Sequence, residues 1–131
     1  MAAALTETPG ASEYFAGGAI TYTNDAKELL LEVPYELLEK VGAVSEEVAC
    51  SMADRIRVKL GTDIGIAITG VAGPDEAESK EAGTIFVAVT SRADRSVKKL
   101  EGDLGREGNR RRAVQVAADL ACDLIQSTSE W

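Results

Sequence analysis

A tyrosine and a lysine, Tyr22 and Lys27, stand where a strand expected over residues 17–23 gives way to a helix that Asn24 or Asp25 would cap. Ligands of α/β sheets gather at the carboxyl ends of strands and at the helix N-termini beside them. Tyr22 and Lys27 are therefore a candidate acid and base, because a lysine near apolar or cationic groups can lose its proton and activate a hydroxyl. The same spacing also fits a buried tyrosine on a strand and a solvated lysine on a helix.

A glycine-rich turn follows the apolar run of residues 64–69 and contains Thr69, Gly70 and Gly73. Glycines let a backbone come close to a ligand and turn its N–H groups toward it. The alternative interpretation is an ordinary turn whose glycines are required only by the backbone conformation. A single Gly-x-x-Gly spacing does not decide between the two.

Four arginines gather near the start of the last expected helix, residues 107–126, in a chain that is otherwise acidic: Arg106, Arg110, Arg111 and Arg112. Cations at a helix N-terminus are unfavourable because they lie at the positive end of the helix dipole, and a nearby anion would offset this cost. Arginine binds phosphate through two parallel hydrogen bonds. The alternative is a solvated face whose charge is balanced by neighbouring carboxylates, Glu101, Asp103 and Glu107.

The composition excludes several kinds of chemistry. The 131 residues include no histidine, which rules out Ser-His-Asp and Cys-His catalysis and histidine-ligated zinc within this chain. The acidic pair Asp75 and Glu76 lacks companions at ligand spacing, so we expect neither a metal site nor a cofactor. A formal net charge of -8 disfavours direct contact with nucleic acid and with an anionic membrane.

The expected compartment is a reducing cytoplasm. No apolar run approaches the roughly 20 residues that span a bilayer, and the opening residues lack the basic start of a secretory signal. Only two cysteines occur, Cys50 and Cys122, and both fall within amphipathic helices, where they are expected to be small buried apolar side chains.

Helical and strand patterns alternate along the chain. Helices are expected over residues 1–8, 26–32, 35–40, 46–60 and 107–126, and strands over residues 17–23, 64–69, 84–90 and 96–100. This interleaving favours one α/β layered domain with a mixed sheet, in which the last two strands form an antiparallel pair.

Several segments, taken together and in order, resemble the CinA C-terminal domain, the nicotinamide mononucleotide deamidase family. They are PGAS, YF, GG and TYTNDAK within residues 9–27, GAVSEEVA at residues 42–49, ITGVAGP at residues 68–74 and AGTIFVAV at residues 82–89. The resemblance extends from about residue 3 to residue 124. It implies a three-layer α/β/α domain, with a mixed sheet of about four strands in this chain.

Members of that family hydrolyse the carboxamide of nicotinamide mononucleotide to the carboxylate and release ammonia. The resemblance implies a serine nucleophile activated by Lys27 and Tyr22, with Thr69 at the pocket wall. It aligns Arg110 with an arginine that reaches the substrate at its phosphate. Backbone N–H groups of the turn at Gly70 and Gly73 would stabilise the oxyanion. The expected partner is a small nucleotide.

The sequence departs from the family at two places. The family's Glu-Ser-Cys-Thr-Gly-Gly motif carries the serine and stands just before the segment that resembles the start of this chain, and it does not occur here. The loop after the glycine turn contains acidic residues, Glu76 and Glu78, where the family usually has a glycine pair, and this does not favour phosphate binding.

Residues 1–131 are therefore expected to form a single domain that lacks the family's first helix and strand. Loss of a strand leaves unpaired backbone groups along its neighbours, so we expect copies of the chain to associate through the open sheet edge. Two functions remain open at this point. One is an amidohydrolase of nicotinamide nucleotides, and the other is a non-catalytic relative that binds a nucleotide or serves only in association.

Overall fold

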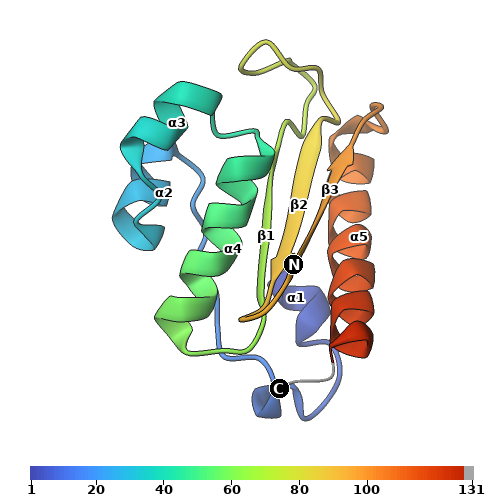
Figure 1. Cartoon of the computed structure of the whole chain (residues 1–131). Helices are drawn as coiled ribbons and strands as arrows, with labels where there is room; N and C mark the ends of the chain where they lie inside the picture. The colour runs from blue at the N-terminus through green and yellow to red at the C-terminus, as the bar shows by residue number, and fades with distance from the viewer. Residues whose placement is uncertain (129–131) are drawn as a thin grey trace.

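The computed structural model describes residues 1–128, whose elements alternate between helix and strand (Figure 1). The helices are α1 (Ala2–Leu5), a 3-10 turn (Ala11–Glu13), α2 (Asn24–Leu31), α3 (Tyr35–Val41), α4 (Glu46–Leu60) and α5 (Gly105–Ser127). The strands are β1 (Gly65–Gly70), β2 (Ile85–Thr90) and β3 (Arg95–Leu100). This agrees with the expected order of elements except around residue 20.

The strands form an antiparallel sheet in the order β1-β2-β3. Ala67 of β1 pairs with Ala88 of β2, and both belong to the apolar cluster that α4 covers. Successive side chains of a strand point to opposite faces, so Val87 packs instead with Ala117 of α5. Helices therefore lie on both faces of the sheet, and α2 and α3 pack against α4 (Figure 1).

The expectation of a mixed sheet of about four strands is wrong in two respects. Within residues 1–128 the sheet has three strands, all antiparallel, and residues 17–23 are not a strand. Alternation of side chains indicates which residues share a face, but a strand also needs a neighbour that pairs with its backbone. Residues 17–23 have no such neighbour, and the side chain of Ile20 is 88% exposed.

Helix α4 forms as its sequence predicts. The side chain of Ser45 accepts a hydrogen bond from the Val48 N–H at 3.2 Å, and the helix ends at Gly61, which has a left-handed φ of 64°. Along the predicted apolar stripe, Val48 and Met52 are buried and Ile56 is partly buried. Leu60, the last member of the stripe, is exposed because the helix runs past the edge of the core.

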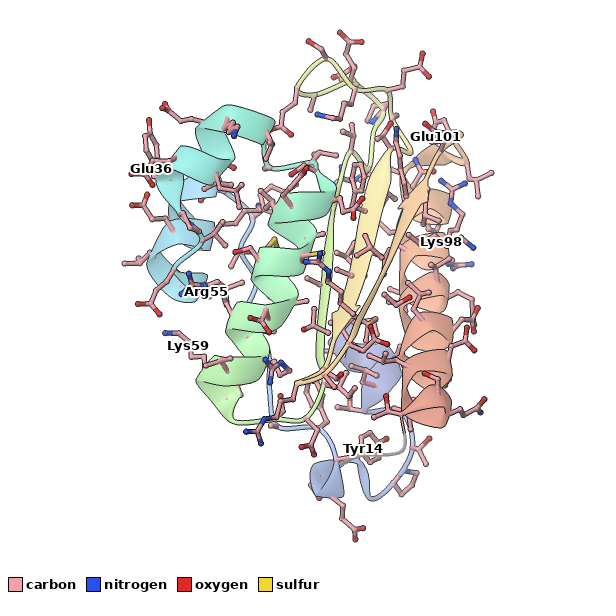
Figure 2. All side chains as sticks on the ribbon, viewed as in Figure 1. Tyr14, Glu36, Arg55, Lys59, Lys98 and Glu101 are labelled. Carbon is pink, nitrogen blue, oxygen red and sulfur yellow. The ribbon has the colours of Figure 1, made fainter. Side chains whose placement is uncertain are left out.

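The expectation of two buried cysteines is wrong, since Cys50 is half-buried and Cys122 is exposed on the outer side of α5. Figure 2 shows the polar outer surface, where Lys59 of α4 and Lys98 of β3 point away from the core. Among residues 1–128, no helix combines the length and the apolar character that crossing a membrane requires.

Helix α4 is fixed against β1 at two points. At one end of β1, a Cβ atom on Gly65 would lie 1.9 Å from the carbonyl oxygen of Ala53, so only glycine permits the backbones to approach this closely. At the other end, the Thr69 hydroxyl donates to the Ala43 carbonyl at 2.8 Å. The turn that precedes α4 is thereby held beside the carboxyl end of β1.

Candidate functional site

Four segments meet at the carboxyl end of β1. They are the extended residues before α2, the turn before α4, the glycine turn after β1 and the first turns of α5. Arg106 of α5 joins two of them, donating to the Gly73 carbonyl at 2.8 Å and to the Tyr22 hydroxyl at 3.4 Å. Thr69 joins β1 to the turn before α4 through its bond to Ala43. The predicted residues Tyr22, Thr69 and Gly73 therefore belong to one connected region.

Lys27 lies in the first turn of α2, with only 6% of its surface exposed. The helix is capped by the Thr23 hydroxyl, which accepts from the Ala26 N–H, rather than by Asn24 or Asp25 as expected. The Lys27 ammonium donates to the Thr21 carbonyl at 2.8 Å. Burial lowers the pKa of Lys27 from its ordinary value, and the negative charge of Glu78 partly opposes this.

Tyr22 is 81% exposed, with its hydroxyl on Arg106. The alternative interpretation of a buried tyrosine and a solvated lysine is therefore wrong for both residues. Because residues 17–23 do not enter the sheet, Tyr22 is free to face outward, while the capped start of α2 directs Lys27 inward. The two side chains do not hydrogen-bond to each other, and each has its own partner.

The glycine turn is held by bonds that were not visible in the sequence. Gly70 passes so close to β2 that an added Cβ would lie 2.6 Å from the Ile85 side chain, and Gly73 has a left-handed φ of 92°. The carbonyl groups of Ala72 and Gly73 accept from Asn109 and Arg106 of α5. The close contact with β2 explains Gly70 and the left-handed φ explains Gly73, so the ordinary-turn interpretation accounts for both without a ligand.

The arginine cluster divides into different roles. Arg112 donates to three backbone carbonyls, those of Gly83, Glu101 and Gly102, and Arg111 forms an exposed ion pair with Glu107 at 2.7 Å. Arg110 is exposed and has no side-chain hydrogen bond or ion pair to residues 1–128. It lies one helical turn beyond Arg106 and on the same side of α5.

Asn109 is a site residue that the sequence reading missed. Its side chain is fully buried, and its amide donates to the Ala72 carbonyl at 2.9 Å and to Asp103 at 2.8 Å, while its oxygen accepts from the Leu104 N–H at 2.8 Å. The bond from Asn109, with one from the Gly105 N–H, lowers the pKa of Asp103. The sequence does carry one signal for this burial: Asn109 lies four residues before Ala113 and therefore on the same, inward face of the helix.

Glu78 is a second residue whose bonds within this region the sequence does not predict. Its carboxylate accepts from the Ala43 N–H at 2.6 Å and from the Val44 N–H at 2.8 Å. Glu78 and Ser79 both have left-handed φ values, 53° and 58°, which the sequence does not signal for these residue types. The acidic loop after the glycine turn therefore folds back onto the turn before α4.

Among residues 1–128, neither a metal-binding cluster nor either of two surface hollows includes the residues of this region. Residues 1–128 contain no group of three or more side chains suited to hold a metal ion. Two surface hollows lie elsewhere, one beside Glu32 and Tyr35 at the α2–α3 junction, and one between Cys50 of α4 and the turn after β2. Neither includes Tyr22, Lys27 or Thr69.

Comparison with known proteins agrees with this fold along almost the whole chain. Residues 1–125 match the model of the CinA C-terminal domain. A competence-damage inducible protein of Listeria welshimeri is 43% identical over 127 residues, which are 95% of this chain and 30% of that protein. Its counterpart in Bacillus subtilis is 39% identical over 93% of this chain and 29% of its own length. The chain thus spans less than a third of these relatives.

Solved structures give the same result. The competence/damage inducible protein CihA of Agrobacterium tumefaciens has a TM-score of 0.90 and 35% identity, covering 94% of this chain and 76% of its own. The competence damage-inducible protein A of Klebsiella pneumoniae has a TM-score of 0.90 and 32% identity, covering 97% and 80%. The chain belongs to the CinA C-terminal domain family.

Proposed function

We propose that the region around Lys27 is the site of a nicotinamide-nucleotide amidohydrolase, which converts the carboxamide of nicotinamide mononucleotide to the carboxylate and releases ammonia. The observation that supports this most is the state of Lys27. Lys27 is buried, donates to a carbonyl and forms no ion pair with residues 1–128. Such a lysine costs stability, and groups of this kind are concentrated at functional sites.

The chemistry requires a base that accepts the proton of an attacking hydroxyl and returns it to the leaving ammonia. Burial favours the neutral amine of Lys27, which is the form that accepts a proton. Tyr22, turned toward Arg106, is placed to donate a hydrogen bond to the substrate or to the proton path. The walls of the site are Thr69 and the turn at Gly70 and Gly73.

The nucleotide phosphate is assigned to the face of α5 that carries Arg106 and Arg110. Arg106 is already engaged with Tyr22 and Gly73, whereas the exposed guanidinium of Arg110 has its hydrogen-bond donors free for an anion. This local positive charge lies in a chain of net charge -8, which favours a small anion over a nucleic acid.

A second candidate, a nucleotide-binding relative without catalysis, is favoured by the hydroxyl groups of the site. The hydroxyl of Thr69 is bonded to Ala43, and that of Ser45 is bonded to Gly42 and caps α4. Among residues 1–128, no serine or threonine hydroxyl hydrogen-bonds to the Lys27 amine or to the Tyr22 hydroxyl, whose partners are the Thr21 carbonyl and Arg106.

One pair of measurements separates these functions. The chain is titrated calorimetrically with nicotinamide mononucleotide and with its acid product, and ammonia release is followed in parallel by a coupled assay. Binding with ammonia release supports the amidohydrolase. Binding without release supports the non-catalytic relative, and absence of binding to either nucleotide overturns both.

A further inference from the structure

The carboxylate of Glu78 joins two parts of the site that are far apart in the sequence. Its two oxygens accept from consecutive backbone N–H groups, those of Ala43 and Val44, at 2.6 and 2.8 Å. A carboxylate that accepts two N–H bonds is held much more firmly than one with a single neutral partner. The loop of residues 71–84 is thereby fastened to the turn before α4.

The backbone around Ala43 is held from both sides. Glu78 accepts from its N–H, and the Thr69 hydroxyl donates to its carbonyl at 2.8 Å. Gly42 makes room for the carboxylate, because a Cβ at that position would lie 2.8 Å from Glu78 Oε1. The turn, the loop and β1 therefore form one connected support beside Lys27.

Glu78 also supplies the negative charge that acts on Lys27. The two residues form no direct ion pair, and the attraction acts through space. Other acidic groups lie on or beside α2 and on α4, which packs against α2: Asp25, Glu28, Glu32, Glu46, Glu47 and Asp54. The charge that raises the pKa of Lys27 is nevertheless that of Glu78. The charged neighbour of the buried lysine thus comes from the loop.

We propose that Glu78 is a positioning residue of this site, holding the turn before α4 in place and keeping a negative charge beside Lys27. Its meaning for catalysis rests on the function proposed above. In that mechanism Lys27 must lose its proton, so release of the loop carboxylate shifts the lysine toward the neutral, base-competent amine. The position of the loop carboxylate then adjusts the pKa of Lys27, which burial lowers more strongly.

The test compares three variants with the unmodified chain. Glu78→Gln removes the charge and keeps one oxygen acceptor, and Glu78→Asp keeps the charge but withdraws it by one methylene. Glu76→Gln is the matched control, because it removes the same charge from the same loop at a side chain that has no hydrogen bond to residues 1–128. Two readouts are taken without substrate: the pKa of Lys27 by NMR of its labelled side chain, and hydrogen exchange at the Ala43 and Val44 amides.

We expect Glu78→Gln to lower the pKa of Lys27 below that of the unmodified chain and of Glu76→Gln. Exchange at the two amides should accelerate in both Glu78 variants and stay unchanged in the control. An equal Lys27 pKa in Glu78→Gln and Glu76→Gln overturns the proposal. If Glu78→Gln does not fold, Glu78→Asp decides, since unchanged amide exchange there also overturns it. If the chain binds no nucleotide, the proposed function is overturned, but the Lys27 pKa and the amide exchange still test the role of Glu78 because both are measured without substrate.

Discussion

Replacing Asn109 with alanine tests whether α5 and the glycine turn depend on one buried amide. The side chain is fully buried and makes three hydrogen bonds, to Ala72, Asp103 and Leu104. Alanine leaves the Ala72 carbonyl and the Leu104 N–H without their partners, whereas the exposed Asp103 carboxylate regains its bond from water.

The magnitude follows from these groups. Two partly buried backbone groups that lose their partners cost about 1 kcal/mol each, near the low end of the usual range because water reaches them in part. The space left by the amide adds about another 1 kcal/mol. We therefore expect Asn109→Ala to lower the free energy of unfolding by about 3 kcal/mol, a large part of the roughly 5–15 kcal/mol of an ordinary domain.

The assay is urea denaturation followed by far-UV circular dichroism at pH 7. Gln115→Ala is the matched control, since Gln115 is an exposed amide of the same helix whose one side-chain partner is Asp119. The control should change stability by less than about 0.5 kcal/mol. A loss in Asn109→Ala no larger than that of the control would refute the reasoning, because the three bonds would then have no net value.

The pH dependence gives a second measure of the same variant. Because Asn109 lowers the pKa of Asp103 in the folded chain, the carboxylate contributes stability above its unfolded pKa, and this is lost as the pH falls through the folded pKa. In Asn109→Ala the pKa of Asp103 should return toward its ordinary value, so the fall of stability with acid should become shallower.

Three further changes have expected outcomes. Between the lowered pKa of Lys27 and its ordinary value of 10.5, the folded chain binds fewer protons than the unfolded chain, so its stability rises with pH. Lys27→Met should abolish this rise. Denaturation at several pH values measures it, and an equal slope of stability with pH in both chains contradicts the prediction. Arg110→Ala should weaken nucleotide binding roughly tenfold or more by calorimetry, as loss of a charged hydrogen bond predicts, while Arg111→Ala, which breaks only an exposed ion pair, should not. Gly65→Ala should cost about 3 kcal/mol of stability, since its Cβ would lie 1.9 Å from the Ala53 carbonyl; a change below about 1 kcal/mol would show that α4 moves away easily.

The sequence predicted best those elements whose signals are local. Helix α4 begins after Ser45 and ends at Gly61 as its caps indicate, and β2 follows the apolar run of residues 84–90 with a difference of one residue. These signals depend on neighbours within a few positions, so they survive in any tertiary context.

The failures concern features that depend on distant residues. Residues 17–23 alternate like a strand but have no partner in the sheet, and the exposure of Tyr22 follows from that. The roles of Asn109 and Glu78 rest on bonds across 37 and 35 positions of the chain, to Ala72 and Ala43. Spacing along the sequence carries no information about such contacts until the fold brings them together.

The close contact of α4 with β1 at Gly65, and the bond from Thr69 to the turn before α4, also determine which parts of the site can move. The backbone of the helix touches the strand at one end, and the turn that leads into the helix is bonded to the strand at the other end. Such a helix does not slide or rotate gradually, because close-packed contacts allow discrete arrangements. The pair should therefore open to hydrogen exchange only together, as one cooperative unit. The loop of residues 71–84 is fastened to the turn before α4 and to α5 by side chains alone, so it should be the part of the site that fluctuates most easily.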